Sequence, residues 1–109
     1  MNLESFLEIL KSAKDFMEKS IEDCHDGGPV VADVVNIWID KKVQMDIIIE
    51  IIANAGFASS LEKKGKEKNI FNIAPRIKGQ GFRRQTAAEK LCEFLKSCGY
   101  EVSVKRIMD

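Results

Sequence analysis

Histidine and cysteine, which most often supply metal ligands and nucleophiles, are scarce in this chain of 109 residues. The single histidine, His25, directly follows Cys24, and adjacency in sequence does not give a thiol and an imidazole the geometry of a catalytic pair. We expect His25 to lie at a helix end and contact terminal carbonyl groups. The three cysteines have no C-x-x-C spacing, and Cys92 and Cys98 are predicted to be small core residues. The sequence therefore predicts no catalytic set, no metal site and no cofactor.

Long apolar runs are also absent, since none approaches the roughly 18 residues that a membrane-spanning helix needs. The N-terminal residues 1–4 lack the basic segment that precedes the apolar part of a signal peptide. We therefore expect a cytoplasmic protein that does not contact membranes. With 45% apolar and 31% charged residues, the chain is predicted to form a single domain over 1–109. A leading helix is expected within 1–27 and an α/β core over 28–109.

The net charge is zero, but the charges are unevenly distributed along the chain. Residues 1–54 hold five lysines and eleven acids, whereas residues 55–109 hold twelve basic residues and six acids. Within residues 63–84 the only acid is Glu67. The basic residues of that segment are Lys63, Lys64, Lys66, Lys68, Arg76, Lys78, Arg83 and Arg84. This cluster is the strongest compositional signal in the sequence.

Apolar residues that recur every three or four positions predict a helix that begins after Asn2 as its N-cap. The sequence Asp26-Gly27-Gly28-Pro29 is expected to end it, because glycine closes helices and proline does not continue them. Ile9 and Phe16 lie off the predicted core face and form a second, smaller apolar stripe. They are either partly buried under a loop or contacts for a partner or a second copy of the chain.

Residues 30–40 are dense in β-branched side chains and predict a buried strand, although a helix extending toward Gly56 is the alternative. Asp40 is the expected N-cap of a deeply buried helix that Gly56 closes. Two strands, 57–61 and 69–73, then flank a basic turn and predict a hairpin. Thr86 and Glu89 have the spacing of a capping box that starts a helix at Ala87, and Gly99 is the expected C-terminal cap of that helix. Residues 100–105 alternate with a period of two, which predicts a last strand.

This order predicts an α+β fold: an N-terminal helix followed by βαββαβ, the split βαβ or ferredoxin-like arrangement of a two-layer sandwich. The apolar residues of the later strands are expected to point to one side, which the two later helices cover. If residues 30–39 were helical, the N-terminal half would be entirely helical. The C-terminal half would then be a β-hairpin, a helix and a strand, closer to a winged-helix layout.

The segment Arg76-Ile77-Lys78-Gly79-Gln80-Gly81 resembles the R-x-x-G-x-G loop that holds the acyl-CoA pyrophosphate in GNAT acetyltransferases. The resemblance covers roughly residues 69–104 and implies that backbone amides at a helix start hold phosphate. It makes a truncated GNAT-like acetyltransferase a third functional hypothesis. The sequence differs from that family in Arg83, which replaces a usually small residue, and in the predicted helix start five residues after Gly81.

The basic cluster predicts a non-catalytic binding module in which lysines and arginines from two turns gather and neutralise phosphates of nucleic acid. Trp38 is the one aromatic residue on a predicted strand that is a candidate for contact with a partner, and a position in the core is the alternative. The alternative is a small inhibitor or adaptor that docks an oppositely charged protein, of a type often encoded by mobile genetic elements. Charge separation along the chain also permits a homodimer.

Overall fold

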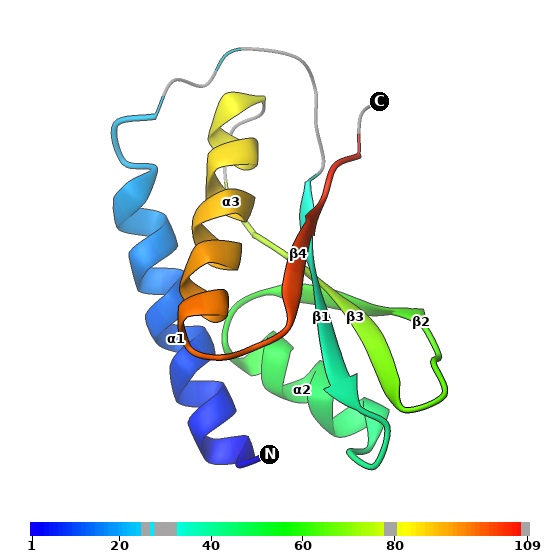
Figure 1. Cartoon of the computed structure of the whole chain (residues 1–109). Coiled ribbons are helices and arrows are strands. Elements are labelled where there is room, and N and C mark those ends of the chain that lie inside the picture. Colours follow the sequence, from blue (N-terminus) through cyan, green and yellow to red (C-terminus); the bar gives the residue numbers. More distant parts are fainter. Residues whose placement is uncertain (25–26, 28–32, 78–80, 108–109) are drawn as a thin grey trace.

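The computed structural model describes residues 1–24, 27, 33–77 and 81–107. It contains three helices and four strands in these residues (Figure 1). In chain order they are α1 (Leu3–Ser20), β1 (Val34–Asp40), α2 (Met45–Asn54), β2 (Ala58–Lys63), β3 (Lys68–Ala74), α3 (Phe82–Ser97) and β4 (Val102–Lys105). The predicted leading helix followed by βαββαβ is confirmed.

The four strands form one sheet in the order β2-β3-β1-β4, and every neighbouring pair is antiparallel. β1 and β3 are the central strands, and their register places Asp40 opposite Lys68 and Val35 opposite Ile73. The β2–β3 pairing has an irregularity between Leu61 and Lys63. The α+β two-layer architecture is thus established, and the finer ferredoxin-like assignment stays a prediction.

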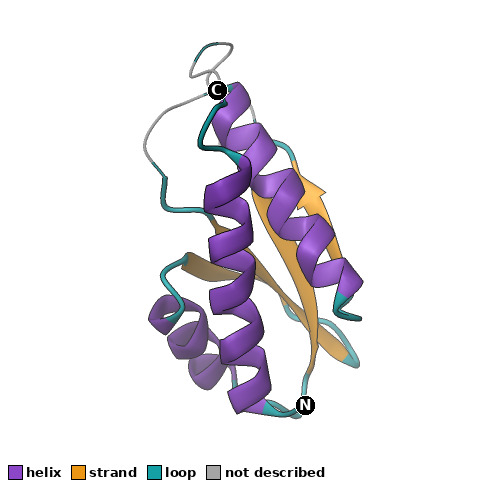
Figure 2. Ribbon diagram, turned by 90° about the vertical axis from the view of Figure 1, so that its left-hand side faces the viewer, coloured by secondary structure: helices purple, strands orange, loops and turns teal. Residues whose placement is uncertain are grey.

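The three described helices pack on the same face of the sheet, so none of them covers the opposite face. Figure 2 shows α1 and α3 side by side in front of the strands. A single hydrophobic core joins Phe6 and Met17 of α1 with Ile37 of β1, Ile48 of α2 and Leu91 of α3. Placing α1 in this layer buries four of its residues, which explains why its apolar stripe is as long as the helix.

Helix α1 begins as predicted, because the Asn2 side chain accepts a hydrogen bond from the Ser5 backbone amide at 3.1 Å. It ends earlier than predicted, at Ser20. The Ile21 amide donates to the carbonyl groups of both Met17 and Glu18, a tightened last turn that ends the helix without glycine. Of the expected stop signal, Gly27 is described, whereas Asp26, Gly28 and Pro29 lie outside the described residues.

Residues 34–40 are a strand, so the helical alternative and the winged-helix layout are wrong. Burial alternates along β1: Val35, Ile37 and Ile39 face the core, and the residues between them face away. The apolar residues of β1 are nearly continuous in sequence, but the strand is buried on one face only. Residues 30–32 of the predicted strand lie outside the described residues.

Helix α2 differs from its prediction in both its start and its burial. Its N-cap is Gln44, because the Asp40 carboxylate instead accepts a hydrogen bond from the Lys42 amide at 2.9 Å within the preceding turn. Only Ile48 and Ile52 are fully buried, since the helix lies over one end of the sheet and leaves its other apolar residues half-exposed. The expectation of a deeply buried helix is therefore wrong.

Helix α3 starts at Phe82, five residues before the predicted Ala87. The Phe82 amide donates to the Gly27 carbonyl at 3.0 Å, which anchors the helix start to the segment after α1. The Gln85 amide already donates to Gly81, so Thr86 lies inside the helix and the capping box does not form. The predicted end near Gly99 is confirmed, with Cys98 as the C-cap.

Two glycines that follow helices have positive φ angles, +96° at Gly56 and +93° at Gly99. A side chain is strained in this conformation, so we expect Gly56→Ala and Gly99→Ala each to lower the free energy of unfolding by about 1–2 kcal/mol. A Cβ at Gly99 meets nothing within 4 Å, whereas one at Gly56 approaches the Lys14 ammonium at 2.6 Å. Urea denaturation of both variants measures the cost, and a neutral Gly99→Ala would contradict the strain argument.

Candidate nucleic-acid interface

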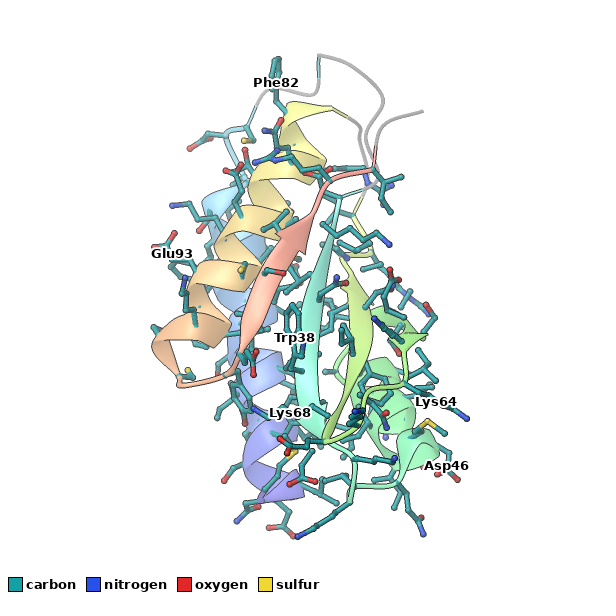
Figure 3. The ribbon with its side chains drawn as sticks, turned by 45° about the vertical axis from the view of Figure 1, so that its right-hand side comes forward. Trp38, Asp46, Lys64, Lys68, Phe82 and Glu93 are labelled. Carbon is teal, nitrogen blue, oxygen red and sulfur yellow. The ribbon has the colours of Figure 1, made fainter. Side chains whose placement is uncertain are left out.

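The lysines of the β2–β3 hairpin lie together at one end of the sheet. Lys63, Lys64, Lys66 and Lys68 are all exposed. Figure 3 shows Lys64 and Lys68 near the lower end of the molecule. Lys68 donates to Glu101 at 2.9 Å, and this hydrogen bond and the charge of Glu101 raise the pKa of Lys68. Lys63, Lys64 and Lys66 form no ion pair with any residue that the structure describes.

The predicted arginines lie at the other end of the sheet. Strand β3 spans about 20 Å from Lys68 to Ala74, given about 3.4 Å per residue, and Arg76 lies two residues beyond its end. Phe82, the first residue of α3 and the neighbour of Arg83 and Arg84, stands at the upper end in Figure 3. The prediction that the two basic turns gather into one patch is therefore wrong. Lys78 lies outside the described residues.

Two of these arginines face acidic residues of the same chain. Arg76 and Arg83 line a cavity of about 370 Å³ together with Lys14, Glu18 and Glu22, and Lys14 forms an ion pair with Glu18 at 3.7 Å. Arg84 is half-buried. The carboxylates of Glu18 and Glu22 thus partly offset the positive charge of this cavity, in which the three cationic side chains still outnumber them.

Two further lysines, Lys41 and Lys42, join the hairpin lysines in the structure. They occupy the turn between β1 and α2 and are exposed. The Lys41 amide donates to the Glu67 carbonyl at 3.0 Å, so a backbone hydrogen bond ties this turn to the hairpin. We name the six residues the lysine cluster: Lys41, Lys42, Lys63, Lys64, Lys66 and Lys68. Sequence reasoning missed the first two because only the antiparallel β1–β3 register brings the two turns together.

Two neighbouring hollows open within the lysine cluster. One of about 630 Å³ is lined by Lys41, Lys42 and Lys64, and one of about 580 Å³ by Lys41, Lys42, Lys66 and Lys68. Three carboxylates also line them: Asp40, Asp46 and Glu67. Lysines outnumber carboxylates along these walls, so the local charge is positive.

Trp38 lies on the sheet face that no helix covers. It is half-exposed at the centre of β1, directly opposite Ile70 of β3 (Figure 3). Its neighbours in the register are polar, since Asn36 pairs with Asn72 and with Ser103. Trp38 is therefore half-exposed and not a core residue, it lies beside Ile70 with polar residues around the pair, and a partner contact at Trp38 stays a prediction. Phe71, the next aromatic residue along the central strands, points into the core.

The second apolar stripe of α1 packs against α3. The rings of Phe16 and Phe94 lie 5.5 Å apart, and Phe16 remains 36% exposed. Ile9 is half-buried against the core. These contacts account for the burial of both residues by helix packing, where a covering loop was expected. A partner contact at Ile9 and Phe16 stays a prediction.

Thiol and metal chemistry find little support in the described part of the chain. The three cysteines are unpaired, and burial raises the pKa of the Cys92 thiol, which makes it a weaker nucleophile at neutral pH. No group of three or more potential metal ligands occurs among residues 1–24, 27, 33–77 and 81–107. His25 lies outside these ranges.

The uncovered sheet face carries one carboxylate held by two donors. Asn72 donates its side-chain amide to Glu62 at 2.6 Å, and the Lys105 ammonium donates to the other carboxylate oxygen. The hydrogen bond from Lys105, followed by that from Asn72, lowers the pKa of Glu62. This network joins the edge strands β2 and β4 across the two central strands.

Because the folded-state pKa of Glu62 is lowered, its contribution to stability is present above its ordinary pKa of 4.5 and is lost as the pH falls through the folded value. We expect Glu62→Gln to reduce the slope of unfolding free energy against pH below about pH 5. Denaturation at several pH values between 3 and 7 tests this. A slope identical to that of the unmodified chain would show that the network does not couple protonation to folding.

Comparisons with known proteins give no relative: no family model matches the chain, and neither a curated protein nor a solved structure matches it. None of the described helices is long and apolar enough to cross a membrane. The resemblance of residues 76–81 to the GNAT loop gains one feature, because α3 starts directly after Gly81. Residues 78–80, the middle of that loop, lie outside the described residues.

Proposed function

We propose that this protein is a non-catalytic module that binds the phosphate backbone of nucleic acid through the lysine cluster. One observation carries the proposal: the Lys41 amide donates to Glu67, which ties two lysine-bearing turns into one exposed surface. Five of the six lysines form no ion pair with a described residue. An ammonium group without a fixed carboxylate is free to exchange its counterion for a phosphate.

The chemistry of lysine favours backbone contact over sequence readout. An ammonium on a flexible stem acts as a mobile point charge and imposes no planar, two-point geometry on a base edge. Phosphate contacts position a nucleic acid but carry no sequence information. The lysine cluster therefore supports affinity that is general among sequences and sensitive to salt. Arg76, Arg83 and Arg84 are not part of this proposed surface, because they lie at the other end of β3.

Binding should weaken steeply as salt is raised. For about four phosphate contacts on double-stranded DNA, an increase from 50 to 200 mM KCl lowers the association constant by about a hundredfold. Fluorescence anisotropy with labelled 20-nucleotide RNA and DNA, single- and double-stranded, measures this slope. Absence of binding to all four probes at 50 mM KCl would refute the proposal.

Charge reversal locates the contact. We expect Lys41→Glu with Lys64→Glu to weaken binding at 50 mM KCl at least tenfold, because each reversal removes one attraction and adds one repulsion. The matched control is Lys19→Glu with Lys96→Glu, which changes the net charge equally on the last turns of α1 and α3. Circular dichroism checks that both variants fold. Equal losses in the two variants would indicate a general charge effect, and a loss only in Arg83→Glu with Arg84→Glu would place the contact at the other end.

A protein partner with an acidic surface is the second candidate function, because Trp38 and Ile70 leave an apolar spot on the uncovered sheet face beside the ion-paired Lys68. Interfaces commonly place an aromatic anchor inside a charged rim. The oligonucleotide measurements separate the two functions. If the chain binds none of the four oligonucleotides at 50 mM KCl and a protein partner covers Trp38, the adaptor or inhibitor role is supported.

A further inference from the structure

The larger hollow of the lysine cluster has an apolar interior. Its walls come from the start of α2 and from the neighbouring strands, and its volume is about 630 Å³. The apolar side chains that line it are Val43, Met45, Ile49 and Leu61. All four are half-exposed where they pack at the edge of the core. We refer to this hollow as the groove.

Asn69 is the one buried polar side chain in this lining, which also includes the exposed side chains of Gln44 and Asp46. Asn69 lines the groove, is only 4% exposed, and faces the core side of β3 opposite Ile39. Its side-chain oxygen is buried and accepts no hydrogen bond from any residue that the structure describes. A buried amide oxygen without a donor costs free energy, so a chain retains it at a binding site more readily than in a core. The unpartnered amide therefore points to a ligand that carries a hydrogen-bond donor.

The rim of the groove supplies the complementary charge. Lys41, Lys42 and Lys64 line the same hollow whose interior holds Asn69. A ligand that fills the groove thus meets apolar side chains, the Asn69 amide and three ammonium groups, and one exposed carboxylate, Asp46, also lines the groove. A flat, partly apolar heterocycle attached to an anion can contact the apolar walls, hydrogen-bond to the amide and bind the ammonium groups.

We propose that the groove binds a nucleobase, with the Asn69 amide hydrogen-bonded to the base edge and the attached phosphate held by the lysines of the rim. An asparagine amide offers one acceptor and one donor side by side, which matches the paired donor and acceptor on a base edge. An acyl chain would fill the apolar walls but leave Asn69 unpaired. This inference rests on the proposed function and adds a base-reading position to a surface that otherwise contacts phosphates.

Base preference is the property to measure. We expect the chain to distinguish single-stranded 12-nucleotide homopolymers of A, C and U, and to favour one of them by about five- to a hundredfold, as one well-placed amide–base pair does. Fluorescence anisotropy at a fixed 100 mM KCl gives the ratio. The mononucleotides AMP, CMP, GMP and UMP are added as competitors, since a base with one phosphate is available from a free nucleotide or from a strand. Competition by one mononucleotide assigns the groove to free nucleotides, and preference among strands alone assigns it to single-stranded nucleic acid.

Asn69→Ala should remove the preference and retain the salt-dependent binding that all sequences share. The matched control is Asn36→Ala: its side-chain oxygen is also buried and has no hydrogen-bond partner among the described residues, but Asn36 as a whole is half-exposed and lies on the opposite, uncovered sheet face. A second variant, Met45→Trp, fills the groove and should have the same effect as Asn69→Ala without touching the amide. Thermal denaturation shows whether each variant folds.

The failure of this inference is distinct from the failure of the proposed function. Equal affinity for all homopolymers with normal salt dependence would overturn the base site and leave phosphate binding intact. A preference that survives in both Asn69→Ala and Met45→Trp would also overturn it. Absence of binding to every probe in the unmodified chain would refute the proposed function and the base site together.

Discussion

The antiparallel pairing of β1 with β3 is the constraint on which the remaining structure depends. Its register places Asp40 opposite Lys68, so the turn after β1 and the hairpin turn before β3 meet at one end of the sheet. The hydrogen bond from Lys41 to Glu67 extends this pairing beyond the strands. Because side chains alternate along a strand, the same register turns Ile37 and Ile39 toward the helices and Trp38 toward the uncovered face. One set of backbone hydrogen bonds thereby creates the core, the lysine cluster and the free face.

The position of α1 accounts for the asymmetry between the two sheet faces. Its stripe, which includes Phe6, Leu10 and Met17, enters the same core as the other two helices, so apolar burial is concentrated on one side. The other sheet face carries polar pairs, among them Lys105 with Glu62 and Lys68 with Glu101. Exposed ion pairs contribute little net stability, so these pairs keep the face polar and orderly more than they hold the fold together. α2 is displaced to one end of the sheet, and the groove lies beside its first turn.

Local patterns in the sequence predicted the elements well and their surroundings poorly. β-Branching identified β1, alternation identified β4, and Asn2 identified the start of α1, because each depends on residues close in sequence. The start of α3 was missed because the Phe82 amide is satisfied by Gly27, a partner more than fifty residues away that no local pattern reveals. The shallow burial of α2 was missed because its apolar residues do not show which neighbours cover them. The candidate site was predicted in part. The hairpin lysines were named from the sequence, whereas Lys41, Lys42 and Asn69 join them only through the register of β1 with β3.

The charges are distributed differently in the folded chain than along the sequence. The acidic first half and basic second half suggested two oppositely charged ends, but folding brings Arg76 and Arg83 beside Glu18 and Glu22. Opposite charges at this end offset each other, so the arginine-bearing turn contributes less to the outside potential than its composition implies. The other basic turn meets two lysines contributed by the acidic half, Lys41 and Lys42, which add to its charge. A chain of zero net charge therefore gathers six exposed lysines at one end of the sheet, next to a groove in which the Asn69 side-chain oxygen has no hydrogen-bond partner among the described residues.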